Sequence, residues 1–213
     1  VLDAGGHDIV FDHRCYFLID NNVTLTIKDA VIKNKKGTIS PFVIQLKGPG
    51  SILVLDNVTF AMNYDVTFSQ GRLFFYDDVV VTGSSKFIYS SPHASFIEPH
   101  SSLIFDLGTT FSYAPAESAD KNLIKMYDKT SRMYLNGCTL STTRTGLQLT
   151  KGSLVISHKN YFYNQNGDGT AASSLSEAIV FGNGNLQDDL NIQILPNGSV
   201  DIKSGVLDYQ NVT

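Results

Sequence analysis

The sequence has no long apolar run, no excess of positive charge and only two cysteines, and each shortage excludes a class of protein. The longest apolar runs, such as 73–76 and 79–81, are far shorter than the roughly 18 to 20 residues of a membrane-spanning helix. Lysine and arginine number 16 against 20 aspartates and glutamates, a net charge of −4. No basic stripe can neutralise a nucleic-acid backbone. We therefore expect no transmembrane segment and no nucleic-acid partner.

The two cysteines, Cys15 and Cys138, are far apart in the sequence and lack the close pairing of zinc ligands. Each lies among apolar neighbours, which favours small buried core residues, with a disulfide as the alternative. The cysteines therefore leave the redox compartment open.

What the sequence does contain is a recurring unit of an alternating strand, a polar corner and a second apolar pair. Leu53–Phe60 is the clearest copy, and Leu25–Ile32 and Met133–Leu140 repeat it in the same frame. Looser copies begin at Leu73, Leu103, Leu154 and Val200. Such a unit cannot bury its apolar face alone, so its recurrence roughly every 20 to 30 residues indicates coils stacked on one another.

The alternation predicts which side chains face the core, because one apolar set lies on one side of each strand. These are Leu25, Ile27, Leu53, Leu55, Phe60, Leu73, Phe75, Leu103, Phe105, Leu135, Leu154, Ile156 and Ile202. At the corners, Asp29, Asn57, Asn136 and Asn160 fit left-handed or bridge backbone and can form a hydrogen-bonded ladder along the stack.

Two stretches interrupt the repeat, near 114–121 and 164–174, and we interpret both as loop insertions, with residues 175–180 forming a short helical turn. Harmless insertion is the alternative to a binding role for these loops. Both ends of the chain lie inside the repeat, so we expect residues 1–213 to be a single β-solenoid segment of a longer protein.

The opening 1–11, VLDAGGHDIVF, resembles the start of many secreted right-handed parallel β-helix proteins, and 23–34 and 52–60 resemble their repeated strands. Those proteins include pectin-lyase-like domains, autotransporter passengers and bacterial adhesins. Ala4 stands where glycine is usual. The resemblance implies a three-faced coil and an extracellular or cell-surface location, and says little about chemistry.

Enzymes of that kind need acidic clusters with a nearby arginine, or paired aspartates with a Gly-His-Gly motif. The adjacent pairs Asp77-Asp78 and Asp188-Asp189 should point to opposite faces of a strand, and Gly5-Gly6-His7 is not the motif. The arginines, with none of the expected sequence neighbours, are Arg14, Arg72, Arg132 and Arg144. We therefore predict no catalytic, cofactor-binding or metal-binding residues.

Three further patterns have plain structural explanations. Residues 164–169 copy the first half of an EF-hand loop, but Leu175 replaces the bidentate glutamate, and Glu177 could replace it only in an irregular loop. Tyr161-Phe162-Tyr163 could stack on sugar rings, although alternate rings of such a run usually enter the core. The sequons at Asn22, Asn57, Asn197 and Asn211 follow from turn asparagines that precede strands.

The sequence as a whole predicts an all-β protein, a right-handed parallel β-helix with short loop insertions. We expect a non-catalytic structural or adhesive rod that contacts a surface glycan or protein, with self-association or end-to-end assembly. The alternatives are a polysaccharide lyase or glycosidase, and a viral receptor-binding fibre.

Overall fold

In the part of the chain that the structure, a computed structural model, describes, every regular element is a β-strand and every strand pair is parallel. The structure describes residues 1–12, 16–35, 43–115, 121–143, 146–165, 177–183, 185, 188 and 190–210. Within them the chain forms an all-β stack with parallel sheets, an arrangement compatible with a β-solenoid.

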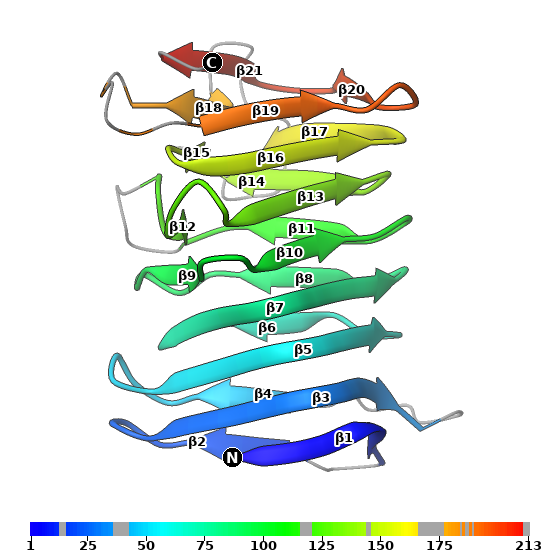
Figure 1. The fold of residues 1–213 in the computed structure, drawn as a ribbon, viewed down its shortest axis with the longest axis vertical. Helices are drawn as coiled ribbons and strands as arrows, with labels where there is room; N and C mark the ends of the chain where they lie inside the picture. The colour runs from blue at the N-terminus through cyan, green and yellow to red at the C-terminus, as the bar shows by residue number, and fades with distance from the viewer. Residues whose placement is uncertain are drawn as a thin grey trace.

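The largest sheet runs along the whole stack, from the first strand near the N-terminus to a strand near the C-terminus (Figure 1). Its order is β1 (Leu2–Phe11), β3 (Thr24–Asn34), β5 (Ile52–Met62), β7 (Arg72–Gly83), β10 (Ser102–Phe105), β13 (Arg132–Asn136), β16 (Gly152–Ser157) and β19 (Leu190–Ile194). A short branch leaves this path at β7, where β9 (Ser95–Ile97) pairs with β7 and β12 (Ile124–Met126) pairs with β9.

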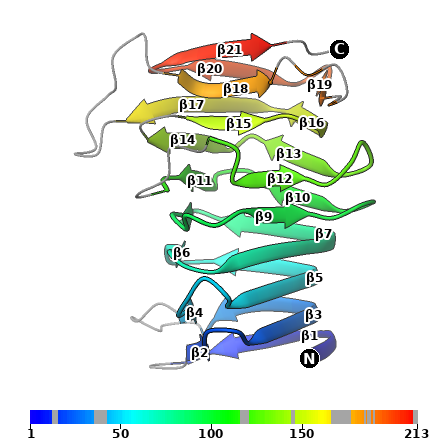
Figure 2. The same ribbon diagram turned by 90° about the vertical axis from the view of Figure 1, so that its left-hand side faces the viewer.

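The second sheet lies behind the first in Figure 1, and its strands run in the opposite direction. Its order is β6 (Val66–Phe68), β8 (Lys86–Tyr89), β11 (Thr110–Tyr113), β14 (Thr139–Thr143), β17 (Lys159–Gln165) and β20 (Ser199–Ile202). The remaining strands are β15 (Leu147–Leu149), β18 (Glu177–Gly182) and β21 (Val206–Gln210) in one sheet and β2 (Tyr16–Ile19) with β4 (Val43–Leu46) in another. Figure 2 shows β9, β12, β15, β18 and β21 above one another on the side turned to the viewer.

The core is a set of side-chain files that pass from coil to coil. Ile27, Leu55 and Phe75 are register partners in β3, β5 and β7, and all are fully buried. In-register stacking places one apolar side chain on another, and burying each of them contributes about 1.5 to 3 kcal/mol. The expected core positions that are buried are Ile27, Leu53, Leu55, Phe60, Leu73, Phe75, Leu103, Phe105, Leu135, Leu154 and Ile156.

Two of the expected core positions lie near the ends of the described stack and differ. Leu25 is half-buried against the core. Ile202 is 43% exposed, so its assignment to the core is wrong. Its strand, β20, is the last of the second sheet, and pairs on one side with β17. The alternation of apolar and polar residues alone does not show whether other strands cover that position.

The bends between successive strand segments use left-handed backbone, as the corner residues predict. Asp29 and Asn57 have φ of 48° and 53°, which confirms the expectation for these two. The side-chain amide of Asn57 donates to Oδ1 of Asp29 in the preceding coil at 2.8 Å. Asp77 and His100 also adopt positive φ, at 49° and 58°. Asparagine and aspartate accept this region at lower cost than other side chains.

At a second corner the ladder forms, but the left-handed residue is a neighbour of the asparagine. Nδ2 of Asn136 donates to Oδ1 of Asp106 at 2.6 Å, and Oδ1 of Asn136 lies 2.6 Å from Nδ1 of His158. Positive φ falls on Gly137 and His158 instead of Asn136 and Asn160. Asn160 is fully buried and accepts the backbone N–H of residue 138 at 2.9 Å. It therefore satisfies buried backbone groups without occupying the left-handed region.

The insertions near 114–121 and 164–174 fall mostly outside the described residues, which stop at 115 and 165 and resume at 121 and 177. Strand β17 continues to Gln165, so the second insertion starts later than expected. Residues 177–180 belong to strand β18, which contradicts the helical turn expected over 175–180. The sheet partners of β18 on both sides explain the difference, since tertiary pairing overrides a weak local preference.

We expect Asn57→Ala to lower the free energy of unfolding by about 1 kcal/mol, because alanine tolerates positive φ poorly and loses the ladder bond to Asp29. Asn57→Gly keeps the backbone geometry and should cost less. Chemical denaturation of both variants measures the difference. A glycine variant less stable than the alanine variant would contradict the role of the left-handed bend.

Candidate functional site

The outer surface of the second sheet carries a polar hollow. Strand alternation sends one set of side chains inward, where Phe87, Phe111, Leu140 and Phe162 are buried. The other set faces outward on β8, β11, β14 and β17. Every second residue of these four strands therefore contributes its side chain to the outer surface.

The register between these strands brings small hydroxyl side chains together. Thr110 of β11 is the partner of Lys86 on one side and of Thr139 on the other. Ser112 pairs with Ser141, whose other partner is Tyr163 of β17. The two middle strands thus carry short side chains while the flanking strands carry long ones.

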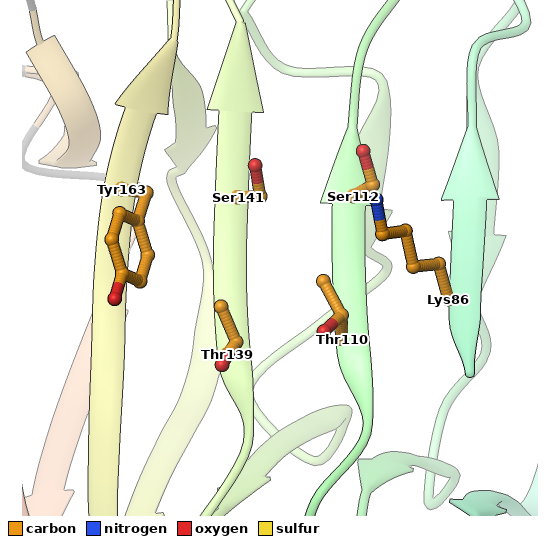
Figure 3. A pocket seen from close by; sticks show the side chains of 6 residues that line it. All are labelled: Lys86, Thr110, Ser112, Thr139, Ser141 and Tyr163. Atoms are coloured by element: carbon orange, nitrogen blue, oxygen red, sulfur yellow. The ribbon is translucent and has the colours of Figure 1, made fainter. Parts of the chain in front are cut away.

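This difference in side-chain size hollows the surface. We call the hollow the polar trough, and it has a volume of about 210 Å³. Its lining is Lys86, Thr110, Ser112, Thr139, Ser141 and Tyr163 (Figure 3). Figure 3 shows Lys86 extending toward Ser112 at one side, and the Tyr163 ring at the other.

The trough offers hydrogen-bonding groups that the protein itself does not use. Within the described part of the chain, the side-chain hydroxyls of Thr110, Ser112 and Thr139 have no hydrogen-bond partner. Each hydroxyl can donate one hydrogen bond and accept two. Tyr163 adds an aromatic face and Lys86 a positive charge, so the lining suits a ligand rich in hydroxyl groups.

A charged cluster adjoins the trough on β17, on β20 and at the residue after β20. Nζ of Lys159 and Nζ of Lys203 lie 5.2 and 5.4 Å from the centre of the Tyr161 ring. Both lysines pair with Asp201, at 3.5 and 2.6 Å. The hydrogen bond from Lys203 lowers the pKa of Asp201, and the same bond raises the pKa of Lys203. The cluster holds Tyr161 beneath two cations.

The run Tyr161-Phe162-Tyr163 divides as strand alternation predicts. Phe162 is fully buried in the core, whereas Tyr161 and Tyr163 are half-buried on the outer surface. The prediction that alternate rings enter the core is therefore confirmed. Two aromatic rings remain outside, and one of them lines the trough.

The adjacent acids Asp77 and Asp78 do not separate to opposite faces. Both are exposed, because the positive φ of Asp77 interrupts the alternation. Arg72 is exposed at the start of the same strand, β7. The expectation of opposite faces is wrong, because a left-handed residue inside the strand changes the face to which the following side chains point.

The bend also brings Asp77 close to Asp56 of the neighbouring strand. Partial burial raises the pKa of Asp56, and the charge of Asp77 raises it further, while Lys28 opposes the shift. Lys28 itself pairs with Asp3 and Asp29 at 3.7 Å. No sequence pattern predicts this cluster, because its members come from strands far apart in the sequence, β1, β3, β5 and β7.

The other residues considered from the sequence lie apart or outside the described part. Asp188 is bound by Asn183 at 2.9 Å and by Lys151 at 3.3 Å, and the hydrogen bond from Asn183 lowers its pKa. The side chain of Arg132 is exposed at the start of β13. Outside the described residues lie Arg14, Arg144, Asp189 and Cys15.

Cys138 and Asn164 are both core residues. The Cys138 thiol is free and buried, and burial raises its pKa to about 12, so it stays protonated and unreactive at neutral pH. Asn164 is fully buried on β17. It therefore does not belong to an exposed calcium loop, of which residues 166–176 fall outside the described part.

The three described sequon asparagines are exposed at bends or turns. Asn22 has a φ of 63°, Asn57 belongs to the ladder, and Nδ2 of Asn197 lies 3.4 Å from Nε2 of His158. Asn211 lies beyond the described residues. Asn22 and Asn57 thus have a conformational reason for their positions, since asparagine accepts the left-handed backbone there.

In the described residues no group of three or more histidine, cysteine, aspartate or glutamate side chains is arranged to hold a metal ion. Among the same residues no helix is long and apolar enough to cross a membrane. Comparison with known proteins gives no matching family model, no matching curated protein and no matching solved structure.

Proposed function

We propose that this chain is part of an extracellular or cell-surface rod, a right-handed parallel β-helix, that binds a saccharide in the polar trough without cleaving it. The observation that carries the proposal is the lining of the trough, where the hydroxyls of Thr110, Ser112 and Thr139, without a partner among the described residues, lie between an aromatic ring and a lysine.

The right-handed coil is supported by the direction of the strands. In Figure 1 the nearer strands, such as β3 and β5, point to the right and the farther strands, such as β8, point to the left as the chain climbs. A chain that rises in this sense turns as a right-handed helix. The resemblance of residues 1–11 to secreted β-helix proteins favours the same fold and location.

The role of a rod is supported by the continuity of the core and of the corner ladder. Strands about 4.8 Å apart form a stiff parallel stack. Hydrogen bonds between coils, such as Asn57 to Asp29 and Asn136 to Asp106, tie the corners together. Such a stack displays its outer side chains in fixed rows, which suits the presentation of a binding surface.

Binding without cleavage follows from the groups in the trough. Hydrolysis of a glycosidic bond uses two carboxyl groups, and a serine or threonine nucleophile needs a neighbouring base. The lining instead offers hydroxyls for hydrogen bonds, a ring for stacking and one fixed charge. These are the groups that hold a sugar in place.

We expect Tyr163→Ala to weaken saccharide binding by roughly tenfold, because a stacking surface of about 0.5 to 1.5 kcal/mol is lost together with one wall of the trough. Titration calorimetry with oligosaccharides that bind the wild-type protein measures the change. Tyr16→Ala, which removes a ring that is 60% exposed elsewhere, is the matched control. Equal losses in both variants would contradict the trough as the site.

A polysaccharide lyase or glycosidase is the second candidate, and the raised pKa of Asp56 beside Asp77 favours it. A carboxylic acid next to a carboxylate is a recurring arrangement of acid and base groups. Incubation with pectin, alginate and neutral glycans, with and without calcium, tests it through reducing-end and unsaturated-product assays. We would conclude that the protein is an enzyme if it turned over one of these substrates and if Asp56→Asn, Asp77→Asn or a change of Asp78 or Arg72 abolished the turnover.

A further inference from the structure

A second hollow, of about 410 Å³, lies where the turn before β10 meets the turn before β13. We call it the basic hollow, and its lining is His100, Ser102, Lys129, Thr130 and Arg132. It is separate from the polar trough, with which it shares no lining residue. Two of its five lining residues carry a permanent positive charge.

The two turns that form the hollow are fixed to each other by hydrogen bonds. The backbone N–H of His100 donates to Oγ1 of Thr130 at 2.8 Å, and Arg132 N–H donates to the Ser101 carbonyl at 2.9 Å. The hydroxyl of Ser131 donates to the Glu98 carbonyl at 3.0 Å. A ligand therefore meets a formed site and does not have to order these turns, which lowers the cost of binding.

The two cations have no acidic partner in the described part of the chain. Neither Lys129 nor Arg132 has a carboxylate oxygen within 4.0 Å there. One guanidinium nitrogen of Arg132, Nη1, donates to Oη of Tyr134 at 3.3 Å, which orients the group. Of the five N–H donors of an arginine, the others stay available.

Ser102 is the most informative residue of the hollow. It is 92% buried, with a relative exposure of 8%, and it lines the hollow. Its hydroxyl has no hydrogen-bond partner among the residues that the structure describes. The register places Ser102 directly beside Arg132. The Ser102 hydroxyl can therefore donate a hydrogen bond to a ligand or to solvent in the hollow.

Two carboxylates lie near the hollow, and their surroundings differ. Oδ1 of Asp128 accepts the N–H and the hydroxyl of Thr130 at 2.8 and 2.6 Å, and the hydroxyl bond contributes most to its lowered pKa. The Asp128 carboxylate is thus hydrogen-bonded to Thr130, one of the lining residues. Asp78 is the register neighbour of Ser102 on the side away from Arg132.

We propose that the basic hollow binds an oxyanion, a sulfate, phosphate or carboxylate group of a ligand. Arg132 offers paired N–H donors that match the oxygens of such a group, Lys129 adds a point charge, and the Ser102 hydroxyl donates from the floor. The site does not depend on saccharide binding in the trough, so either can fail without the other.

The test is titration calorimetry of the whole chain with inorganic sulfate and phosphate, and then with dextran sulfate, a polyuronate and uncharged dextran oligomers. We expect saturable binding of at least one anion and none of dextran in the basic hollow. Arg132→Ala should weaken anion binding about tenfold or more, and Lys129→Gln and Ser102→Ala by roughly threefold or more. The order of the affinities for the sulfate, phosphate and carboxylate ligands identifies which oxyanion the hollow binds.

Two comparisons separate a built site from general attraction to polyanions. Lys86→Ala removes one charge in the trough and should leave anion affinity unchanged. Asp78→Asn removes a negative charge near Ser102 and should strengthen anion binding several-fold. Equal losses in Lys86→Ala and Lys129→Gln, weaker binding in Asp78→Asn, or no saturation by any anion would each overturn the proposal. Because Arg132 is exposed, circular dichroism should show an unchanged fold in its variant.

Discussion

Replacing Leu55 with aspartate should lower the free energy of unfolding by about 4 kcal/mol or more. Leu55 is fully buried, and its register partners in the coils before and after it, Ile27 and Phe75, are fully buried as well. The new carboxylate would have neither water nor a cation beside it, so it must stay desolvated or take up a proton. Guanidinium-induced unfolding measures the loss.

The matched control for this change is Thr59→Asp in the same strand, β5. Thr59 lies on the outer surface, half-buried, between Val31 and Val80. Its aspartate variant keeps access to water and should lose less than about 1 kcal/mol. If the Thr59 variant proved the less stable of the two, the assignment of inner and outer surfaces on β5 would be wrong.

Phe87→Ala should lower the free energy of unfolding by about 3 to 5 kcal/mol. Phe87 is fully buried at the centre of an aromatic cluster, with ring centres of four other phenylalanines within 6.3 Å. Those neighbours are Phe60, Phe68, Phe105 and Phe111. They come from four other strands, so the surrounding backbone cannot close around the space that the ring leaves.

Phe74→Ala is the control that separates cavity formation from the loss of a ring contact. Phe74 is half-buried and its ring stacks on Phe96, with ring centres 5.3 Å apart. Its removal exposes a surface instead of creating a closed space, and should cost about 1 kcal/mol. A loss as large as that of the Phe87 variant would mean that the outer stack supports the fold as strongly as the core.

The sequence was sufficient for the repeat and for most of the core, because both depend on alternation within a few residues. Leu53 and Leu55 could be placed inside from their own strand alone. Ile202 could not, because its exposure depends on which strands lie beyond β20. The left-handed bends at Asp77 and His100 were also missed. Asp77 lies in the looser copy of the repeat that begins at Leu73, and His100 lies in a turn outside the repeated unit.

Neither hollow was predicted from the sequence, because the residues of each come together only when successive strands stack. A signal for the trough does exist. Thr110-Phe111-Ser112 and Thr139-Leu140-Ser141 are the same pattern 29 residues apart (139 − 110), and a fixed spacing predicts that they stack. For the basic hollow no such repeat is present, since Ser102 and Arg132 differ in kind although they are register partners.

Register pairing from coil to coil has a consequence for how the molecule comes apart. Each strand of the long sheets is held by its counterparts in the adjacent coils, as β5 is held by β3 and β7. Free energy in such a stack adds up as a chain of neighbour terms. Backbone amides of the strands that end each sheet should therefore exchange with solvent first, and protection should rise toward Phe87 and Phe105 in the middle of the stack.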